Sequence, residues 1–278
     1  MAVGSTLKAA YQRPLSSLDT LGSQLAFYVK AIAWSPRTVR RYKKEILRLL
    51  AEVTLGSGAL AVIGGTVGVI LAMSFFTGTE VGLQGYAALN QIGTAAFSGF
   101  VSAYFNTREI APLVAGIALA ATVGCGFTAQ LGAMRISEEV DALEVMAIPS
   151  LPFLVTTRII AGLIAIVPLY VVGLLSSYFA TRLTVTQFFG QSSGTYDHYF
   201  NTFLPPGDVL WSFGKVLVFA VVVILIHCYH GYNASGGPAG VGIAVGHAVR
   251  TSIVAINVID LFLSMAIWGT TTTVRLAG

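Results

Sequence analysis

The sequence predicts an all-α polytopic membrane protein, and three observations support this fold class. First, 55% of the 278 residues are hydrophobic and 10% are charged, with a mean hydropathy of +0.78, whereas soluble domains carry roughly 25% charged residues. Second, five apolar stretches are long enough to cross a bilayer as helices. Third, the basic residues are concentrated ahead of the first of these stretches.

Residues 1–52 are expected to form an N-terminal interfacial amphipathic helix on the cytoplasmic surface. Nine of the sixteen Lys and Arg residues lie in the first 48 positions, and the positive-inside rule places such a segment in the cytoplasm. Trp34 and Tyr42 suit a headgroup layer, whereas Pro14 and Pro36 interrupt a single long helix. A basic cluster also suits nucleic acid, but its place directly before a span favours the membrane and no nucleic-acid partner. No signal peptide is expected, because residues 1–52 contain no apolar core of the needed length.

Residues 53–278 are expected to form the transmembrane permease domain. The predicted spans are 53–76, 109–134, 153–181, 209–230 and 248–271. Polar residues interrupt the stretch 81–105, which is interpreted as a short or re-entrant helix and not as a span. With the N-terminus inside, loops 135–152 and 231–247 are cytoplasmic, and the aromatic loop 182–208 and the C-terminus are extracytoplasmic.

A short acidic segment at 137–148 stands between two apolar stretches. Ser137 is predicted to cap a helix whose first turn is acidic, and Pro149 ends it. On a helical wheel Val140 and Leu143 share an apolar edge, opposite an acidic face. A solvated connecting helix and a docking surface both fit this pattern. The acidic face comprises Glu138, Glu139, Asp141 and Glu144.

Four charged residues fall in or near the spans: Arg108, Glu109, Lys215 and Asp260. An ionised group in the bilayer centre costs roughly 2.5–3.5 kcal/mol on insertion scales, so it needs a partner or a wet cavity. Arg108 and Lys215 have a simpler alternative, since both could extend to the outer headgroup layer. Asp260 has no such route and is a candidate functional residue.

No metal, cofactor or catalytic site is expected in this chain. Cys125 and Cys228 lie in apolar runs and are expected to behave as small buried residues. His227 and His230 share a helical face without a third ligand. The run around Lys215 lacks the spacing of a phosphate-binding loop, so ATP hydrolysis is not expected here.

Several blocks together resemble the MlaE/YrbE permease family, whose members are membrane subunits of ABC-type lipid transporters that work with MCE proteins. The blocks are REIAPLV at 108–114, TAQLGAMRISEEVDALEVM at 128–146, Pro149, Arg158, and GYNASGGPAGVG at 231–242. The resemblance covers residues 45–275 and is greatest to actinobacterial YrbE B-type subunits of Mce systems.

This resemblance implies a function and a set of partners. The segment 137–148 becomes a coupling helix that docks on the ATPase through Glu138, Glu139, Val140, Asp141, Leu143, Glu144 and Met146. Arg108, Glu109, Lys215 and Asp260 lie near the lipid pathway or support it. The implied partners are a second YrbE-type permease subunit, a cytoplasmic ABC ATPase that holds ATP and Mg, MCE proteins on the outer side, and a lipid, which is imported.

Two other function classes are weighed against lipid transport. An ion-coupled secondary transporter would use Glu109 and Asp260 as proton sites, but the sequence has no paired internal repeats. An intramembrane enzyme would need a nucleophile and a base at matching depth, and the spans contain no such pair.

Overall fold

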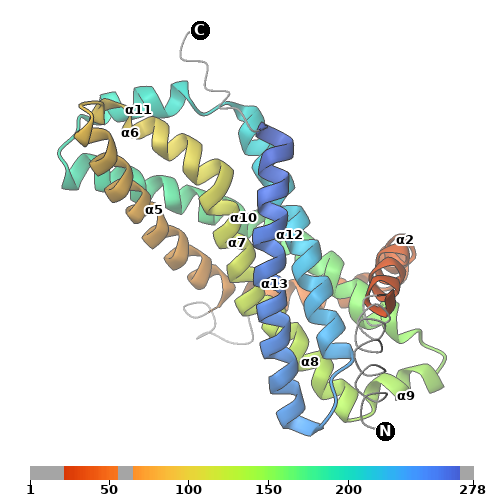
Figure 1. Cartoon of the computed structure of the whole chain (residues 1–278). Helices are drawn as coiled ribbons and strands as arrows, with labels where there is room; N and C mark the ends of the chain where they lie inside the picture. Colours follow the sequence, from red (N-terminus) through yellow and green to blue (C-terminus); the bar gives the residue numbers. More distant parts are fainter. Residues whose placement is uncertain (1–21, 56–64, 270–278) are drawn as a thin grey trace, which may run out of the picture.

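The computed structural model describes residues 22–55 and 65–269, and every regular element in these ranges is a helix (Figure 1). Among them, five helical runs are long and apolar enough to cross a membrane. This confirms the predicted fold class. The runs are α5 (Thr66–Gln91), Ala95–Ile136, Pro152–Phe188, α12 (Pro206–Tyr232) and α13 (Gly237–Trp268).

The first span differs from the predicted range 53–76. Residues 53–55 end α3 (Lys43–Leu55), residues 56–64 lie outside the described part, and α5 continues to Gln91. The polar side chains expected to interrupt this stretch are satisfied within the helix: the Thr77 hydroxyl donates to the Met73 carbonyl at 2.8 Å, and Gln84 donates to Glu80 at 2.9 Å. The stretch 81–105 is therefore shared between the end of α5 and the start of the second run.

The second run begins at Ala95, fourteen residues before the predicted start, and contains π-helical turns. Its parts are η1 (Ala95–Phe97), α6 (Ser98–Val101), the π-helical η2 (Ser102–Ile110), α7 (Ala111–Leu119), the π-helical η3 (Ala120–Gly124) and α8 (Cys125–Ile136). π-Helical turns often lie at functional sites, and η2 contains Arg108 and Glu109.

The third run is the centre of the bundle. It consists of the π-helical η4 (Pro152–Thr156), α10 (Thr157–Leu183) and the π-helical η5 (Thr184–Phe188), and α10 packs on α5, α7, α12 and α3. The α5–α10 contact is close because Gly78 lies against the backbone of Ser177, where an added Cβ would be 2.5 Å from the Ser177 carbonyl oxygen. Small residues allow this approach between membrane helices.

The two expected loops on either side of α12 are mostly helical. In the predicted cytoplasmic loop 231–247, α13 already begins at Gly237. In the predicted outer loop 182–208, η5 continues the third run, and α11 (Ser193–Thr202) lies on α6. Aromatic rings from the two segments pack together, as between Phe97 and Tyr199 with centroids 4.4 Å apart.

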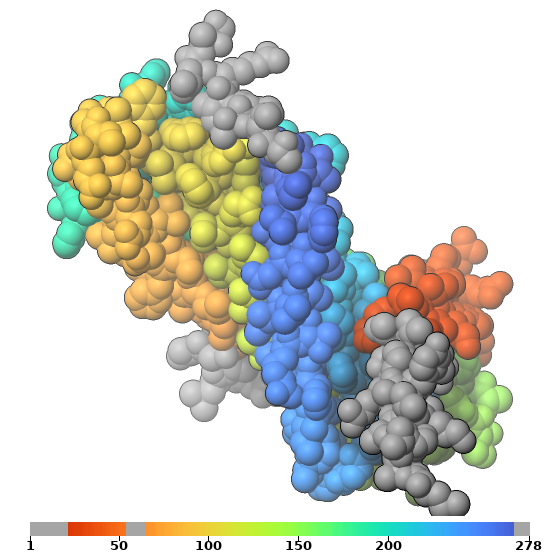
Figure 2. All heavy atoms as spheres, viewed as in Figure 1, coloured from red at the N-terminus to blue at the C-terminus, as the bar shows by residue number. Residues whose placement is uncertain are grey.

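The N-terminal residues form several short helices. Residues 22–33 are helical, Pro36 stands in the first turn of α2 (Ser35–Arg41), and α3 follows. These helices lie at the side of the bundle near α9 (Glu139–Val145), as Figure 2 shows in red beside green. The segment is thus helical as predicted, with breaks at Trp34 and Tyr42.

Candidate functional site

A cluster of buried charges lies where η2, α12 and α13 meet, and Lys215 is its centre. The Lys215 side chain is 0% exposed, and its Nζ lies 2.7 Å from Asp260 Oδ1 and 3.4 Å from Glu109 Oε2. The same nitrogen donates to the Arg108 carbonyl at 2.6 Å and to Ser264 Oγ at 2.8 Å. The ammonium is thus surrounded by acceptors from three helices.

The backbone explains why one of these acceptors is free. In an α-helix the Arg108 carbonyl would accept a hydrogen bond from the residue four positions later, which is Pro112 and has no N–H. The Lys215 ammonium supplies a donor to this carbonyl. Ser264 completes the arrangement by donating to Glu109 Oε1 at 2.8 Å.

A second group lies next to the first, toward the N-terminal end of α12. Arg108 Nη2 and Nε lie 2.6 and 2.7 Å from Asp208 Oδ2, and Trp268 Nε1 donates to Asp208 Oδ1 at 2.9 Å. The Arg108 guanidinium also lies 4.0 Å from the centre of the Tyr104 ring. The five charged residues together, named the charge cluster here, are Arg108, Glu109, Asp208, Lys215 and Asp260.

The charge cluster reaches deep into the bundle. Phe219 stands at the centre of α12, and both Phe219 and Ile256 of α13 lie against Gly116. Lys215 and Asp260 are each four residues, or about 6 Å along a helix, from this level. They are therefore within the apolar part of the span, where unpaired charges are costly.

The structure brings together all four charged residues predicted from the sequence. Arg108 and Lys215 do not extend to the headgroup layer, because both side chains are buried against carboxylates. The sequence reasoning missed Asp208, which it left in the outer loop. A usable signal was present, because Asp208 follows Pro206 in the first turn of an apolar helix.

The acidic helix α9 is shorter than predicted and begins differently. Ser137 does not cap it, since its hydroxyl donates backward to the Ala133 carbonyl at 3.0 Å and ends α8. The cap residue of α9 is Glu138, whose φ of 62° reverses the chain direction after α8. Ala147, with φ 58°, ends the helix two residues after Val145.

The predicted apolar edge of α9 faces the bundle and is not available to a partner. Val140 is 0% exposed, and both Val140 and Leu143 pack in the hydrophobic core. The reason is the hydrophobic effect: the chain's own helices cover the wider apolar face of a short surface helix. The exposed apolar side chains are instead Val145 (88%) and Met146 (62%) at the C-terminal end of α9.

The acids of α9 differ in their contacts. Asp141 pairs with Arg135 at 2.6 Å. Glu144 accepts a hydrogen bond at 2.6 Å from the Ser150 hydroxyl, which also bonds Tyr232 of α12 at 2.7 Å. Glu138 and Glu139 are exposed. The free surface of α9 is therefore formed by Glu138, Glu139, Val145 and Met146.

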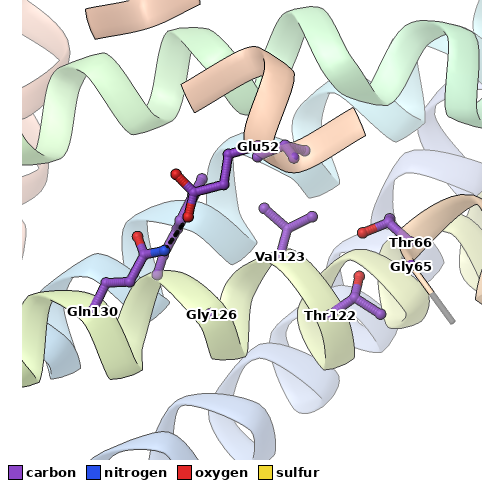
Figure 3. A pocket seen from close by; sticks show the side chains of 9 residues that line it. Glu52, Gly65, Thr66, Thr122, Val123, Gly126 and Gln130 are labelled. Atoms are coloured by element: carbon purple, nitrogen blue, oxygen red, sulfur yellow. Dashed lines mark hydrogen bonds between the residues drawn. The ribbon is translucent and has the colours of Figure 1, made fainter. Parts of the chain in front are cut away.

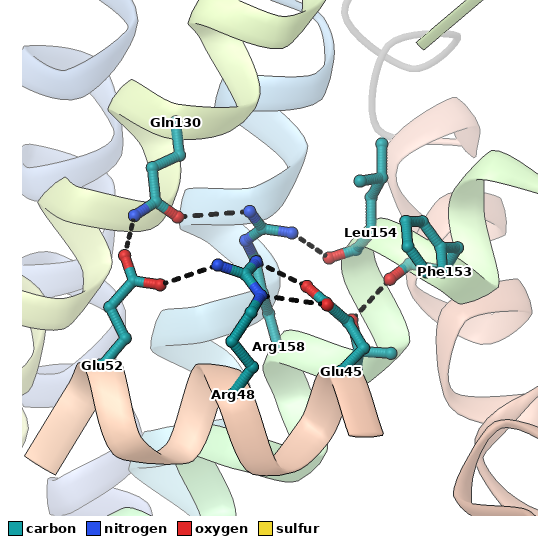
Figure 4. Close-up of polar contacts among 8 residues, drawn as sticks. Glu45, Arg48, Glu52, Gln130, Phe153, Leu154 and Arg158 are labelled. Atoms are coloured by element: carbon teal, nitrogen blue, oxygen red, sulfur yellow. Dashed lines mark hydrogen bonds and ion pairs between the residues drawn. The ribbon is translucent and has the colours of Figure 1, made fainter. Parts of the chain in front are cut away.

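A third polar network joins the N-terminal helices to the bundle (Figure 4). Arg158 is buried and donates to the Leu154 carbonyl at 2.7 Å and to Gln130 Oε1 at 3.2 Å, and Gln130 donates to Glu52 of α3. On α3, a hydrogen bond from Arg48 lowers the pKa of Glu45. This network fixes α3 against α8 and α10.

A cavity of about 300 Å³ lies beside this network. Glu52 and Gln130 line one side of it, and Thr66 and Thr122 line the other (Figure 3). Its chemistry is that of a polar crevice between helices, since it contains one carboxylate and no nucleophile with a base.

The described residues contain no group of three or more His, Cys, Asp or Glu side chains that could hold a metal ion. His227 is buried and has structural partners: its Nδ1 lies 2.8 Å from Thr128 Oγ1, and its Nε2 lies 3.3 Å from Ser252 Oγ. This histidine joins α8, α12 and α13 inside the core.

Comparison with known proteins identifies one family. The model of the family described as Permease MlaE matches residues 56–266. A "Probable ABC transporter permease protein" of Rickettsia bellii is 30% identical over 70% of this chain and 76% of its own length. The "Intermembrane phospholipid transport system permease protein MlaE" of Haemophilus influenzae is 27% identical over 72% and 77%. The chloroplastic "Protein TRIGALACTOSYLDIACYLGLYCEROL 1" of Arabidopsis thaliana is 31% identical over 72% and 57%.

Proposed function

Because this chain belongs to the MlaE permease family, we propose that it is the membrane-embedded permease of an ABC-type lipid transporter. It carries no ATPase motif, so ATP and Mg bind a separate cytoplasmic subunit. The transported molecule is a lipid, in line with the phospholipid system named for the Haemophilus relative. It moves inward, in concert with MCE proteins on the outer side.

The single observation that carries this proposal is the position of α9 between two spans. Two residues connect α9 to α8, and Glu144 is connected through Ser150 to Tyr232 of α12. A force on α9 is therefore passed to the second, third and fourth runs through a hydrogen-bonded contact. This is the mechanical link that a permease without its own ATPase requires.

The free surface of α9 gives the ATPase a contact of mixed character. Val145 and Met146 offer apolar area, and burying each such side chain contributes about 1.5–3 kcal/mol. Glu138 and Glu139 surround this apolar area with negative charge, which sets specificity and the rate of association with a basic groove.

The charge cluster is the proposed support of the lipid pathway. Lys215 is fully shielded, whereas the Glu109 side chain is 33% exposed at the surface between η2 and α13. Glu109 is therefore the member of the cluster that can meet a lipid headgroup or a neighbouring chain. Asp260 and Lys215 hold it in position through Ser264 and a direct ion pair.

A second permease chain of the same family is proposed to cover the outer face of α13. Asn257 is exposed next to Ile256, at the level of the middle of α12, and its side chain bonds only the Ile253 carbonyl at 2.8 Å. An exposed amide at this depth is unfavourable in lipid, and interhelical hydrogen bonds of this kind join membrane helices. Thr251 continues the exposed polar stripe toward the cytoplasmic end.

The proposed orientation places α2, α3 and α9 in the cytoplasm and Trp268 near the outer surface. The basic residues of α2 and α3 support it through the positive-inside rule. The end of α13 near Trp268 and the helices α2 and α9 lie at opposite ends of the bundle in Figure 1, as an odd number of spans requires.

A co-purification experiment tests the docking proposal. Val145→Asp with Met146→Asp is expected to abolish co-purification of the ATPase while the bundle still folds, because both side chains point into solvent. The matched control is Asn201→Asp with Thr202→Asp, which adds the same charge to exposed positions of α11 at the other end. Equal ATPase recovery with both double variants would contradict docking at α9.

Lipid transfer in reconstituted vesicles separates this function from ion-coupled transport. With the ATPase present, movement of a fluorescent phospholipid is expected to require ATP and to be unaffected by a protonophore. Asp260→Leu is expected to reduce this transfer more than it reduces assembly with the ATPase. Transfer that stops with the protonophore and continues without ATP would support a secondary transporter instead.

A further inference from the structure

A small basic cavity lies between α2 and the beginning of the third run, away from the charge cluster. Its volume is about 290 Å³. Its walls combine arginines and aromatic rings from α2 and its flanks with two prolines from the segment after α9. The lining residues are Trp34, Arg37, Thr38, Arg40, Arg41, Tyr42, Pro149 and Pro152.

Two hydroxyl groups in these walls have no hydrogen-bond partner in the described part of the chain. Thr38 is 1% exposed, and neither its Oγ1 nor the Tyr42 hydroxyl makes a hydrogen bond there. A buried hydroxyl without a partner loses about 1–3 kcal/mol relative to water. A ligand with acceptor oxygens that enters the cavity would supply the missing partners.

The positive charge of the cavity is not neutralised by the described protein. No carboxylate in residues 22–55 and 65–269 forms an ion pair with Arg37, Arg40 or Arg41. Arg37 lies over the Trp34 ring at 5.3 Å, and Arg41 lies over the Tyr42 ring at 5.7 Å. Guanidinium groups held in this way remain available for phosphate, which they bind in a bidentate geometry.

The neighbouring surface is suited to the membrane boundary. Leu25, Val29 and Ile32 on the preceding helix and Val39 on α2 are exposed and apolar. The segment 30–44 contains six basic residues and no acidic one. Exposed apolar and basic side chains on one helical segment are typical of a helix that lies among lipid headgroups.

We infer that this cavity binds the phosphate headgroup of an anionic phospholipid in the leaflet on the α9 side of the membrane. The guanidinium groups of Arg40 and Arg41 pair with the phosphodiester, and the Thr38 hydroxyl donates to one of its oxygens. Because Pro149 forms part of the wall, the bound headgroup holds the segment that follows α9 against α2. The site is separate from the lipid pathway and does not depend on the proposed function.

The test uses the full-length chain, purified in detergent and freed of native lipid. The probe is short-chain phosphatidylglycerol below its micellar concentration, titrated by isothermal calorimetry. Arg40→Gln with Arg41→Gln is expected to weaken binding at least about tenfold, since each lost charge-assisted hydrogen bond to phosphate is a large term. Thr38→Val, which keeps the net charge and nearly the same shape, is expected to weaken binding about threefold or more.

The matched control is Lys43→Gln with Lys44→Gln, which removes two charges from the same segment outside the cavity. This variant is expected to change the affinity less than about threefold, because exposed charges at that distance are screened. An equal loss in the two double variants would overturn the site in favour of general surface attraction. Equal binding of short-chain phosphatidylcholine, or full competition by inorganic phosphate, would overturn the assignment to an anionic lipid. Thermal unfolding of each variant separates loss of binding from loss of fold.

Discussion

Removing the ammonium of Lys215 is the most direct test of the charge cluster. Lys215→Met keeps the length and apolar volume of the side chain but deletes its ion pair with Asp260 at 2.7 Å and its bonds to the Arg108 carbonyl and Ser264. Asp260, with a side chain 10% exposed, is then left without its counter-ion. Breaking a buried pair in this way costs about 3–5 kcal/mol of unfolding free energy.

The double variant Lys215→Met with Asp260→Leu tells whether this cost comes from the stranded charge. Replacing both members of a buried pair by apolar residues is often close to neutral. We therefore expect the double variant to be more stable than the sum of the two single losses predicts, with a coupling energy of at least about 1.5 kcal/mol. Reversible unfolding of the purified chain in mixed micelles measures all four free energies.

Arg250→Met provides the control, because Arg250 lies exposed on α13 and bonds the Gly246 carbonyl and His247 on its own helix. Its effect is expected to stay within about 0.5 kcal/mol. The reasoning is refuted if the losses from Lys215→Met and Asp260→Leu are additive. In that case the two groups do not stabilise each other, despite the distance between them.

Three further predictions concern packing and pH. Gly78→Ala forces α5 away from α10 and is expected to cost about 1–3 kcal/mol, whereas Gly214→Ala, in open space within α12, is expected to stabilise by roughly 0.5–1 kcal/mol; thermal unfolding of the two variants should shift in opposite directions. The hydrogen bonds from Arg182 lower the pKa of Asp197; the stabilisation from this pair is therefore present above the unfolded pKa of about 4 and is lost as pH falls through the lower folded value, so the melting temperatures of the wild type and Asp197→Asn should converge in acid. Val140→Ala is expected to cost about 2 kcal/mol without a change of charge, and unchanged melting would contradict its burial under α9.

The sequence predicted the helical class and the number of spans, because both depend on sums over neighbouring residues. Span limits were predicted less well. The start at Ala95 and the extension of α5 to Gln91 were missed, because polar side chains such as Thr77 form bonds within the helix that a hydropathy sum does not include. The family resemblance, confirmed by the match over residues 56–266, supplied the function that hydropathy could not.

For the candidate site, the sequence identified residue types but not their partners. Arg108, Glu109, Lys215 and Asp260 were all selected as charges in an apolar setting. Their pairing joins residues up to 107 positions apart, and no local pattern specifies it.

The amphipathic pattern of α9 likewise defined two faces without deciding which one the protein covers. The tertiary structure buries Val140 and leaves Val145 and Met146 outside, because the adjoining spans already present an apolar surface to the wider face. The sequence alone therefore determined that this chain is a bundle of membrane helices with a few costly charges. Only the tertiary structure decided how those charges pair and which surface of α9 remains free, since both depend on distances between separate helices.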